Sequence, residues 1–420
     1  MTDKRVFRQL SFAPFYMFGI MMMAYAFMID TPEELFAGLY RILVAPSNLI
    51  SDYMEIGSIG SAFFNAGALL VFTVVGVQYT GARVTGAVAA SMIMVAGFSF
   101  FGKNLVNTFP IPLGVWLYAR FHGTPFRSYI HVALFGTGLA PIVSEMIFGV
   151  GLPYAWGIPI GLLVGVFVGF ILVPLSVQFL NFHQGYNLYN VGFTIGIIGM
   201  AFVGFTRMFA IEITPVRYVY TGDDYMVFMF LLVLFAGMVI YGLWTNQGMK
   251  GYQKLLQSSG RMVSDFLVEH TVPLVILNMG LLGLMGLLYV RLSGGVVNGP
   301  IVGGILTMVA FGAFGKHPRN VLPILLGVYV TSALNIYDPA GTESILVALF
   351  ATTLAPIAGQ FGFVAGFIVA ALHDAMAMNI GFVHGGLNLY NNGLSGGFVA
   401  ALAVPILDLI TERFPKKDEE

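Results

Sequence analysis

Two short segments concentrate hydrogen-bonding side chains in an otherwise apolar chain. Residues 182–192 read FHQGYNLYNVG, and residues 383–393 read VHGGLNLYNNG. Each segment holds a His, an Asn-Leu-Tyr-Asn sequence and a Gly, and the two copies lie 201 residues apart, as His183 and His384 show. Because amide side chains both donate and accept hydrogen bonds, such segments are suited to binding a small polar solute.

A second pair of segments adds a lysine to each half of the chain. Residues 101–116 read FGKNLVNTFPIPLGVW and residues 314–329 read FGKHPRNVLPILLGVY, so that Lys103 and Lys316 are 213 residues apart. Gly and Pro close to each lysine favour a broken helix, whose free backbone groups and partial charge can bind a solute at the middle of a bilayer. Two lysines related by a pseudo-two-fold axis would suit an anionic or carbonyl-rich solute.

These paired segments define the predicted substrate-binding site. Its residues are Lys103, Asn104, Asn107, His183, Tyr186, Asn187, Asn190, Lys316, His317, Asn320, His384, Asn388 and Asn391. A different interpretation stays open for each residue type. The lysines could extend from helix ends to the membrane surface, the Asn side chains could cap or join helices, and the histidines could be structural.

Ionisable residues that occur in only one half predict ion or proton coupling. The aligned pairs are Glu145 with Gln360, His131 with Leu346, and His373 and Asp374 with Leu172 and Val173. An ionisable side chain inside a membrane is costly and is therefore a functional candidate by default. Glu145, Asp374 and His373 are the predicted coupling residues. The alternative is that Glu145 or Asp374 lies at a water-exposed helix end.

The composition is that of an integral membrane protein. Of 420 residues, 58% are apolar and 9% are charged, whereas a soluble domain carries about a quarter charged residues. Cysteine is absent and the net charge is −1, so thiol chemistry and thiolate metal sites are excluded and nothing favours nucleic acid as a partner. We expect no metal, no cofactor and no enzymatic activity, because the chain has none of the common soluble-enzyme motifs.

Two tandem repeats, residues 1–210 and 211–420, account for the paired segments. The predicted fold is all-α, with about seven membrane segments in each repeat and broken or re-entrant helices. The predicted segments are 10–29, 57–79, 83–101, 103–121, 128–149, 154–180 and 191–207, and then 225–244, 271–291, 297–314, 320–336, 344–360, 361–382 and 393–411. Amphipathic stretches near 34–50 and 247–266 are expected at the interface, and 103–121 and 320–336 are the predicted broken or re-entrant segments.

An odd number of segments per repeat predicts that the repeats have opposite orientation. Short cytoplasmic loops are rich in Lys and Arg. The loop of the first repeat that carries Arg120, His122 and Arg127 is equivalent to a loop of the second that carries Asp338 and Glu343 instead. The basic stretch at 250–261 is equivalent to a region that carries Glu33 and Glu34. This reversal predicts inverted repeats, a signature of secondary transporters, with both termini in the cytoplasm.

As a whole, the chain resembles an uncharacterised family of bacterial polytopic membrane proteins, which implies a bacterial inner-membrane location. Shorter motifs are similar to those of urea transporters, which are also inverted duplications. NAGALL (residues 65–70) and GYN (residues 185–187) carry this likeness, although the second half reads GLN at residues 386–388. The likeness implies a symmetric pore or site for a small polar solute.

The sequence therefore predicts a membrane transport protein whose partners are a small solute and the lipid bilayer. The leading hypothesis is a secondary transporter for a small polar or anionic solute bound at the interface of the repeats. The alternatives are an uncoupled, channel-like facilitator for a small neutral solute and, from another class, an intramembrane enzyme or a scaffold. Glycine-rich helix faces would permit a homo-oligomer.

Overall fold

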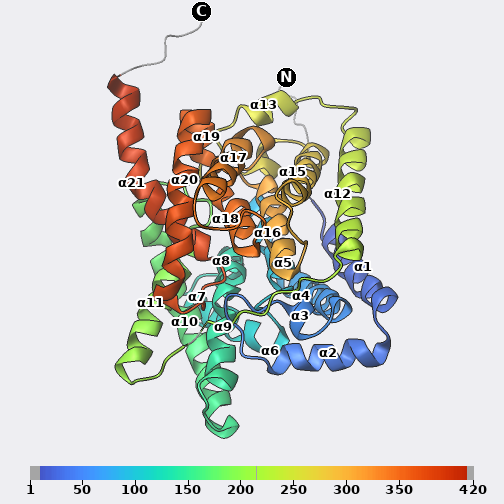
Figure 1. Ribbon diagram of the computed structural model, residues 1–420, viewed down its shortest axis with the longest axis vertical. Helices are drawn as coiled ribbons and strands as arrows, with labels where there is room; N and C mark the ends of the chain where they lie inside the picture. The colour runs from blue at the N-terminus through green and yellow to red at the C-terminus, as the bar shows by residue number, and fades with distance from the viewer. Residues whose placement is uncertain (1–9, 214, 414–420) are drawn as a thin grey trace, which may run out of the picture.

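The computed structural model describes residues 10–213 and 215–413, which form helices, turns and two isolated bridges but no strand. Most helices run roughly along the long axis of the molecule (Figure 1). In the first half they are α1 (Ala13–Ile29), α2 (Pro32–Val44), α3 (Tyr53–Ile56), α4 (Ile59–Tyr79), α5 (Gly86–Phe98), α6 (Leu105–Thr108), α7 (Pro110–Phe121), α8 (Ile130–Gly136), α9 (Ala140–Ser144), α10 (Tyr154–Phe182) and α11 (Asn190–Met208). In the second half they are α12 (Tyr225–Thr245), α13 (Tyr252–Leu256), α14 (Phe266–Glu269), α15 (Val272–Leu292), α16 (Gly299–Ala310), α17 (Pro318–Leu334), α18 (Thr342–Ala351), α19 (Ala355–Phe361), α20 (Phe363–Ile380) and α21 (Asn391–Arg413).

The helices are long and apolar enough to make this a multi-pass membrane protein. Within the described ranges nine continuous helical segments could each cross a bilayer, and the bent pair α1 and α2 could add a tenth. Helix α7 has 12 residues and α17 has 17. At 1.5 Å per residue they extend about 18 and 25 Å, less than the roughly 30 Å of a hydrocarbon core.

Two predicted spans are interrupted at equivalent places. In segment 128–149 the 3-10 turn η2 (Thr137–Leu139) separates α8 from α9, and a π-helical turn η3 (Glu145–Gly149) follows. In segment 344–360 the 3-10 turn η5 (Thr352–Leu354) separates α18 from α19. Each break precedes the sequence Ala-Pro, because proline cannot donate the hydrogen bond that would continue a helix. The freed backbone groups are used in the site described below.

The two amphipathic stretches lie at opposite ends of the molecule. Helix α2 crosses the lower end and α13 the upper end in Figure 1. Helix α2 begins with a complete capping box at Thr31 and Glu34. Stretch 247–266 gives only five helical residues in α13, because Gly248, Gly251 and Gly260 adopt positive φ angles that end or prevent a helix.

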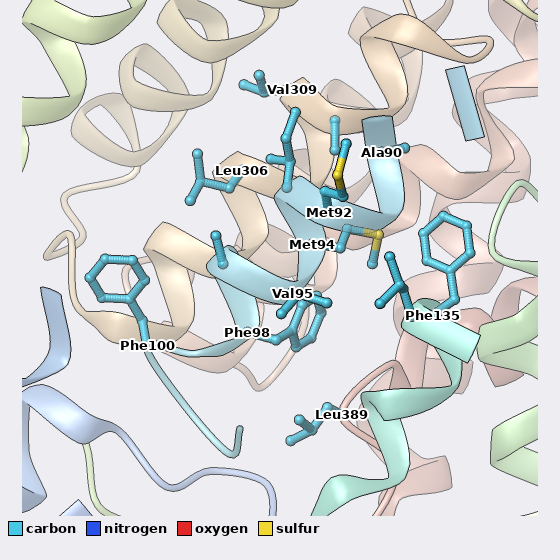
Figure 2. Packing of buried hydrophobic residues seen from close by; sticks show 14 of the residues in the cluster. Ala90, Met92, Met94, Val95, Phe98, Phe100, Phe135, Leu306, Val309 and Leu389 are labelled. Atoms are coloured by element: carbon cyan, nitrogen blue, oxygen red, sulfur yellow. The ribbon is translucent and has the colours of Figure 1, made fainter. Parts of the chain in front are cut away.

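The centre of the core is the crossing of α5 and α16. Gly97 of α5 and Gly303 of α16 face each other so closely that a Cβ atom added to Gly303 would lie 2.9 Å from the Gly97 carbonyl oxygen. Figure 2 shows Met92 and Met94 of α5 beside Leu306 and Val309 of α16, with all four side chains buried. Glycine at the crossing lets two short helices pack backbone to backbone.

Each short central helix leads into a tight turn that carries one of the repeated lysines. Gly102 and Gly315 precede these lysines and have φ angles of +81° and +115°, a region that disfavours residues with a side chain. An asparagine side chain bonds across each turn, and it comes from α4 or α15, the helix that precedes the central helix in the chain. Asn65 Nδ2 donates to the carbonyls of Ser99 (2.7 Å) and Lys103 (2.9 Å), and Asn278 Nδ2 donates to those of Gly312 and Lys316 (both 2.8 Å).

We predict that Gly102→Ala lowers the free energy of unfolding by about 1–3 kcal/mol. The alanine would adopt an unfavourable positive φ, and its Cβ would lie 2.5 Å from a Leu389 methyl carbon. Reversible unfolding of the purified protein in detergent measures this loss. Gly76→Ala is the matched control, because no atom lies within 4 Å of an added Cβ there. Equal stability of the two variants would contradict the role assigned to this turn.

Candidate functional site

Each buried lysine binds a tyrosine from the other half of the chain. Lys103 donates from Nζ to the Tyr390 hydroxyl (2.9 Å), and Lys316 donates from Nζ to the Tyr189 hydroxyl (2.5 Å). Lys316 also donates to the Thr352 hydroxyl (2.6 Å) in the break between α18 and α19. Both lysines are fully buried, with relative exposures of 0%. They therefore do not extend to the membrane surface, which was the alternative interpretation of these residues.

Aromatic rings surround the two ammonium groups in matching positions. Lys103 Nζ lies 5.1 Å from the ring centres of Phe98 and Tyr390, and Lys316 Nζ lies 4.5 Å from Tyr189 and 5.2 Å from Phe311. Phe98 stacks on Phe350 and Phe311 stacks on Phe135, with ring centres 5.6 and 5.8 Å apart. Ring faces attract cations, which offsets part of the loss of hydration.

Neither lysine is neutralised by a carboxylate. Within residues 10–213 and 215–413 the ion pairs join Arg217 to Glu343 (3.2 Å) and Arg291 to Asp224 (2.8 Å), both remote from the lysines in the chain. An ammonium group buried without a counter-ion is unfavourable by several kcal/mol. Two such groups in the core of one protein are therefore unusual and call for an explanation.

A cavity of about 890 Å³ reaches both tyrosines. Its inner wall includes Tyr189, Asn190 and Tyr390, and its rim includes the exposed residues Arg83 and Arg127. Met262, which follows α13, also lines it, so the opening faces the end of the molecule that carries α13. A cavity of this size is typical of a binding site for a small molecule.

The polar groups at the rim are mostly basic. Arg83, Arg127 and His131 contribute side chains from the first half, and the second half contributes Asp265. The Asp265 carboxylate accepts hydrogen bonds from the backbone N–H groups of Gly86 (2.9 Å) and Leu267 (3.0 Å). Burial raises the pKa of Asp265, and these hydrogen bonds oppose that effect. The Asp265 carboxylate thus accepts hydrogen bonds from backbone N–H groups at the start of a helix. The guanidinium groups of Arg83 and Arg127 are then available to attract an anion.

The two His-x-x-x-Asn segments cross at the centre and hold each other. Asn187 Nδ2 donates to the Gly393 carbonyl (2.9 Å), and Asn388 Nδ2 donates to the Gly192 carbonyl (3.5 Å). The N–H of Leu188 donates to the carbonyl of Thr353 in η5, and the N–H of Leu389 donates to that of Gly138 in η2 (both 3.1 Å). The breaks in the two interrupted helices thus provide the carbonyls that position the tyrosines.

Several predicted site residues shape the lysine turns. Asn104 and Asn107 form a capping box at α6, and His317 and Asn320 form one at α17. Asn107 Nδ2 also donates to the Gly102 carbonyl and Asn320 Nδ2 to that of Gly315 (both 2.9 Å). His317 and Asn320 line a separate cavity of about 480 Å³ rather than the central one. These four side chains are occupied as caps, which matches the structural alternative stated for the asparagines.

The predicted histidines pair with asparagines at the ends of their segments. His183 Nε2 lies 3.0 Å from Asn190 Oδ1, and His384 Nε2 lies 2.7 Å from Asn391 Oδ1. Only Asn190 of these four lines the central cavity. Tyr186 lies outside this cavity, where Arg261 donates to its hydroxyl (3.4 Å) and stacks on its ring.

The predicted coupling residues lie in three places outside the central cavity. Glu145 accepts a hydrogen bond from Asn48 Nδ2 (3.0 Å), and His373 pairs with Asn392 (2.8 Å). Asp374 is 1% exposed and accepts from Asn335 (3.1 Å) and Ser332 (3.4 Å). Its other oxygen, Oδ1, is buried and has no hydrogen-bond partner among the described residues. Nowhere in the described chain do three His, Asp or Glu side chains gather as metal ligands would.

Residues that the sequence interpretation overlooked include both lysine partners. Tyr189 and Tyr390 belong to the repeated Asn-Leu-Tyr-Asn sequence and recur at the same spacing of 201 residues. The stacked rings also recur: Phe98 matches Phe311, and Phe135 matches Phe350 within ALFGTGLAPI and ALFATTLAPI. The repeat itself was thus the signal that could have found them.

Fold and cavity together define a multi-pass helical membrane protein with a buried polar centre. The chain belongs to the family described as "Protein of unknown function (DUF1576)", whose model matches residues 31–208 and 244–409. No curated protein and no solved structure matches the chain.

The crossing of the two segments predicts unequal effects of equivalent substitutions. Asn187 makes three side-chain hydrogen bonds, to Gly393, Tyr189 and Thr353, whereas Asn388 makes two and one of them is 3.5 Å long. With about 0.6 kcal/mol per side-chain bond in a membrane and more where a buried group is left unpaired, Asn187→Leu should lower the unfolding free energy by roughly 2 kcal/mol and Asn388→Leu by roughly 1.

Unfolding in detergent with the two variants side by side measures this difference. Asn379→Leu is the control, because Asn379 is exposed and donates to the carbonyl of Ala375 in its own helix. An Asn388→Leu loss as large as that of Asn187→Leu would show that the crossing bonds do not set the stability of this centre.

Proposed function

We propose that this protein is a secondary transporter for a small anionic solute, which binds in the central cavity between two inverted repeats. One observation carries the proposal: two fully buried lysines without a carboxylate partner lie directly behind the tyrosines that line the cavity. An anion in the cavity would supply the missing negative charge. Arg83 and Arg127 at the rim would concentrate such a solute at the opening.

The contacts support an origin of the site in two equivalent halves. Asn65 and Asn278 close the two lysine turns with the same pair of bonds at a spacing of 213 residues. The bonds between the halves are reciprocal, since Lys103 reaches Tyr390 and Lys316 reaches Tyr189. Reciprocal contacts of this kind are what a two-fold axis between repeats produces. With α2 and α13 at opposite ends (Figure 1), the axis would lie in the membrane plane, as in inverted-repeat transporters.

A hydrogen-bonded segment crosses the end of the molecule opposite the cavity opening, and this supports a transporter over a channel. We call residues 216–220 the strap. Its carbonyls at Val216 and Tyr218 accept from Ile50 (2.9 Å) and Asp52 (3.0 Å), which follow α2. The N–H of Val216 donates to Asn48 Oδ1 (2.8 Å), and that of Tyr220 donates to the Asp52 carboxylate (2.9 Å).

A second set of contacts closes the same end beneath the strap. Asn298 Nδ2 donates to the Thr342 hydroxyl (2.9 Å) and to the Tyr220 carbonyl (3.4 Å), and Arg217 pairs with Glu343. Asn298 and Thr342 are the repeat equivalents of Thr85 and Arg127, which border the open mouth. In a transporter these two equivalent mouths would open alternately, whereas a channel would need both open together.

Cross-linking tests this proposal, because the chain has no cysteine of its own. We expect the pair Asn298→Cys and Thr342→Cys, once joined by a disulfide or a short linker, to stop uptake of labelled anions into proteoliposomes. Reductant should restore uptake in the same preparation. Uptake that continues undiminished in the fully cross-linked protein would rule out a path through this closed end. Failure of every tested anion to bind or enter would overturn the transport proposal itself.

Asp374 is the side chain on which we propose that ion or proton coupling depends, with Glu145 and His373 as the other members of the set. Its oxygen Oδ1 has no partner in the described chain and its burial is nearly complete, so a bound cation or proton would stabilise it. The first repeat has Val173 at the equivalent position.

We predict that Asp374→Asn abolishes the dependence of uptake on an imposed pH or sodium gradient and leaves equilibrium binding of the solute within about threefold. Asp338→Asn is the control, because Asp338 is exposed and accepts only from a backbone N–H two residues further along. Gradient-driven uptake that persists in Asp374→Asn would exclude this residue from coupling.

A further inference from the structure

We infer that the solute is an organic anion with an apolar body, rather than a small inorganic anion or a neutral amide. This inference rests on the proposed transport function and specifies its substrate class. It follows from the walls of the cavity, from the placement of its few polar groups and from the absence of a built-in counter-ion.

The walls of the cavity are mainly hydrocarbon. Met94, Phe135, Leu188, Val191, Phe311 and Phe314 line it. Four of these residues come from α5, α8 and the turn after α16, and Leu188 and Val191 come from segment 182–192. All six are buried, with exposures of 8% or less. A small hydrated anion would lose its hydration on entering, and apolar walls offer no hydrogen bonds to replace it. An apolar body is stabilised by contact with these walls, because its apolar surface is removed from water.

Two tyrosines of the cavity wall bond to lysines that are not part of its lining. The hydroxyls of Tyr189 and Tyr390 are each held by a lysine ammonium, and accepting a hydrogen bond from a cation makes a hydroxyl a stronger donor. In the described chain the Tyr390 hydroxyl accepts from Lys103 but has no acceptor of its own. A carboxylate or similar anionic end at this point would accept from the tyrosine and neutralise the lysine behind it.

The size of the cavity is compatible with an organic solute. The cavity volume of about 890 Å³ is about thirty times the roughly 30 Å³ that one water occupies in the liquid. It leaves room for a body of ring size together with several waters. Phe135 and Phe311 both line the cavity and stack on each other with ring centres 5.8 Å apart, so this part of the wall is a flat aromatic surface that favours contact with a planar body.

Four matched probes test this inference on the purified full-length protein: benzoate, benzamide, acetate and nitrate. Benzamide keeps the ring without the charge, acetate keeps the charge without the ring, and nitrate is an inorganic anion. Ligand-induced thermal stabilisation over a concentration series gives an apparent Kd for each. We expect benzoate to bind at least tenfold more tightly than each of the other three.

Two variants, with a third as control, locate the binding. Tyr390→Phe should weaken benzoate at least tenfold, and Tyr25→Phe, which removes a hydroxyl bonded to Met226 far along the chain, should leave it unchanged. Phe314→Leu removes part of the wall without touching a polar group, so benzoate should weaken at least threefold while acetate does not change. This second variant keeps the test valid if Tyr390→Phe does not fold.

The outcomes separate the two levels of proposal. Equal or tighter binding of acetate or nitrate would overturn the apolar body and leave an anion transporter. If benzamide binds most tightly of the four, the solute is not an anion, and the proposed substrate of the transporter is wrong as well. Benzoate binding that neither Tyr390→Phe nor Phe314→Leu weakens would place the ligand outside this cavity and overturn the inference.

Discussion

Two lysine side chains buried in the middle of an apolar protein are the constraint on which the rest of this structure depends. Lys103 and Lys316 are completely buried, and the described chain gives them hydroxyls and ring faces but no carboxylate. Hydroxyl oxygens and aromatic faces stabilise an ammonium group less than an ion pair does. Every other feature of the centre serves to bring these weaker partners close enough to act together.

That requirement explains why the helices at the centre are short and interrupted. A continuous helix satisfies its own backbone and presents side chains only outward. The breaks at η2 and η5 instead release carbonyls of Gly138 and Thr353, which accept from the segments carrying Tyr390 and Tyr189. Close contact between Gly192 and Gly393, where an added Cβ would lie 2.9 Å from the facing backbone, allows those segments to cross. Each lysine can then reach a tyrosine of the other half.

The sequence predicted which segments form this centre, but it did not predict which side chains bond to one another. Repeat spacing identified the lysine turns and the asparagines that cross, because equivalent residues keep equivalent chemistry, and the amphipathic pattern identified helix α2. Spacing says which residues match, however, and not which ones touch. Lys103 matches Lys316 but contacts Tyr390, a pairing that exists only once the halves are docked. Tyr186 was favoured over Tyr189 although its equivalent is Leu387, and the structure places it against Arg261 instead.

The departures from symmetry are as informative as the symmetry. If both halves were identical in their contacts, the two mouths would be equivalent and neither closed state would be preferred. Here Lys316 has a second hydroxyl partner in Thr352 that Lys103 lacks, and Asn48 joins the strap at one end to the carboxylate of Glu145. The residue equivalent to Glu145 is Gln360, and the one equivalent to Asn48 is Arg261. In the proposed transporter, a carboxylate that is joined to the strap through Asn48 at one end, and replaced by a neutral amide at the other, would give the two closed states different dependence on charge. Such a difference is what a coupled transporter needs and an uncoupled pore does not.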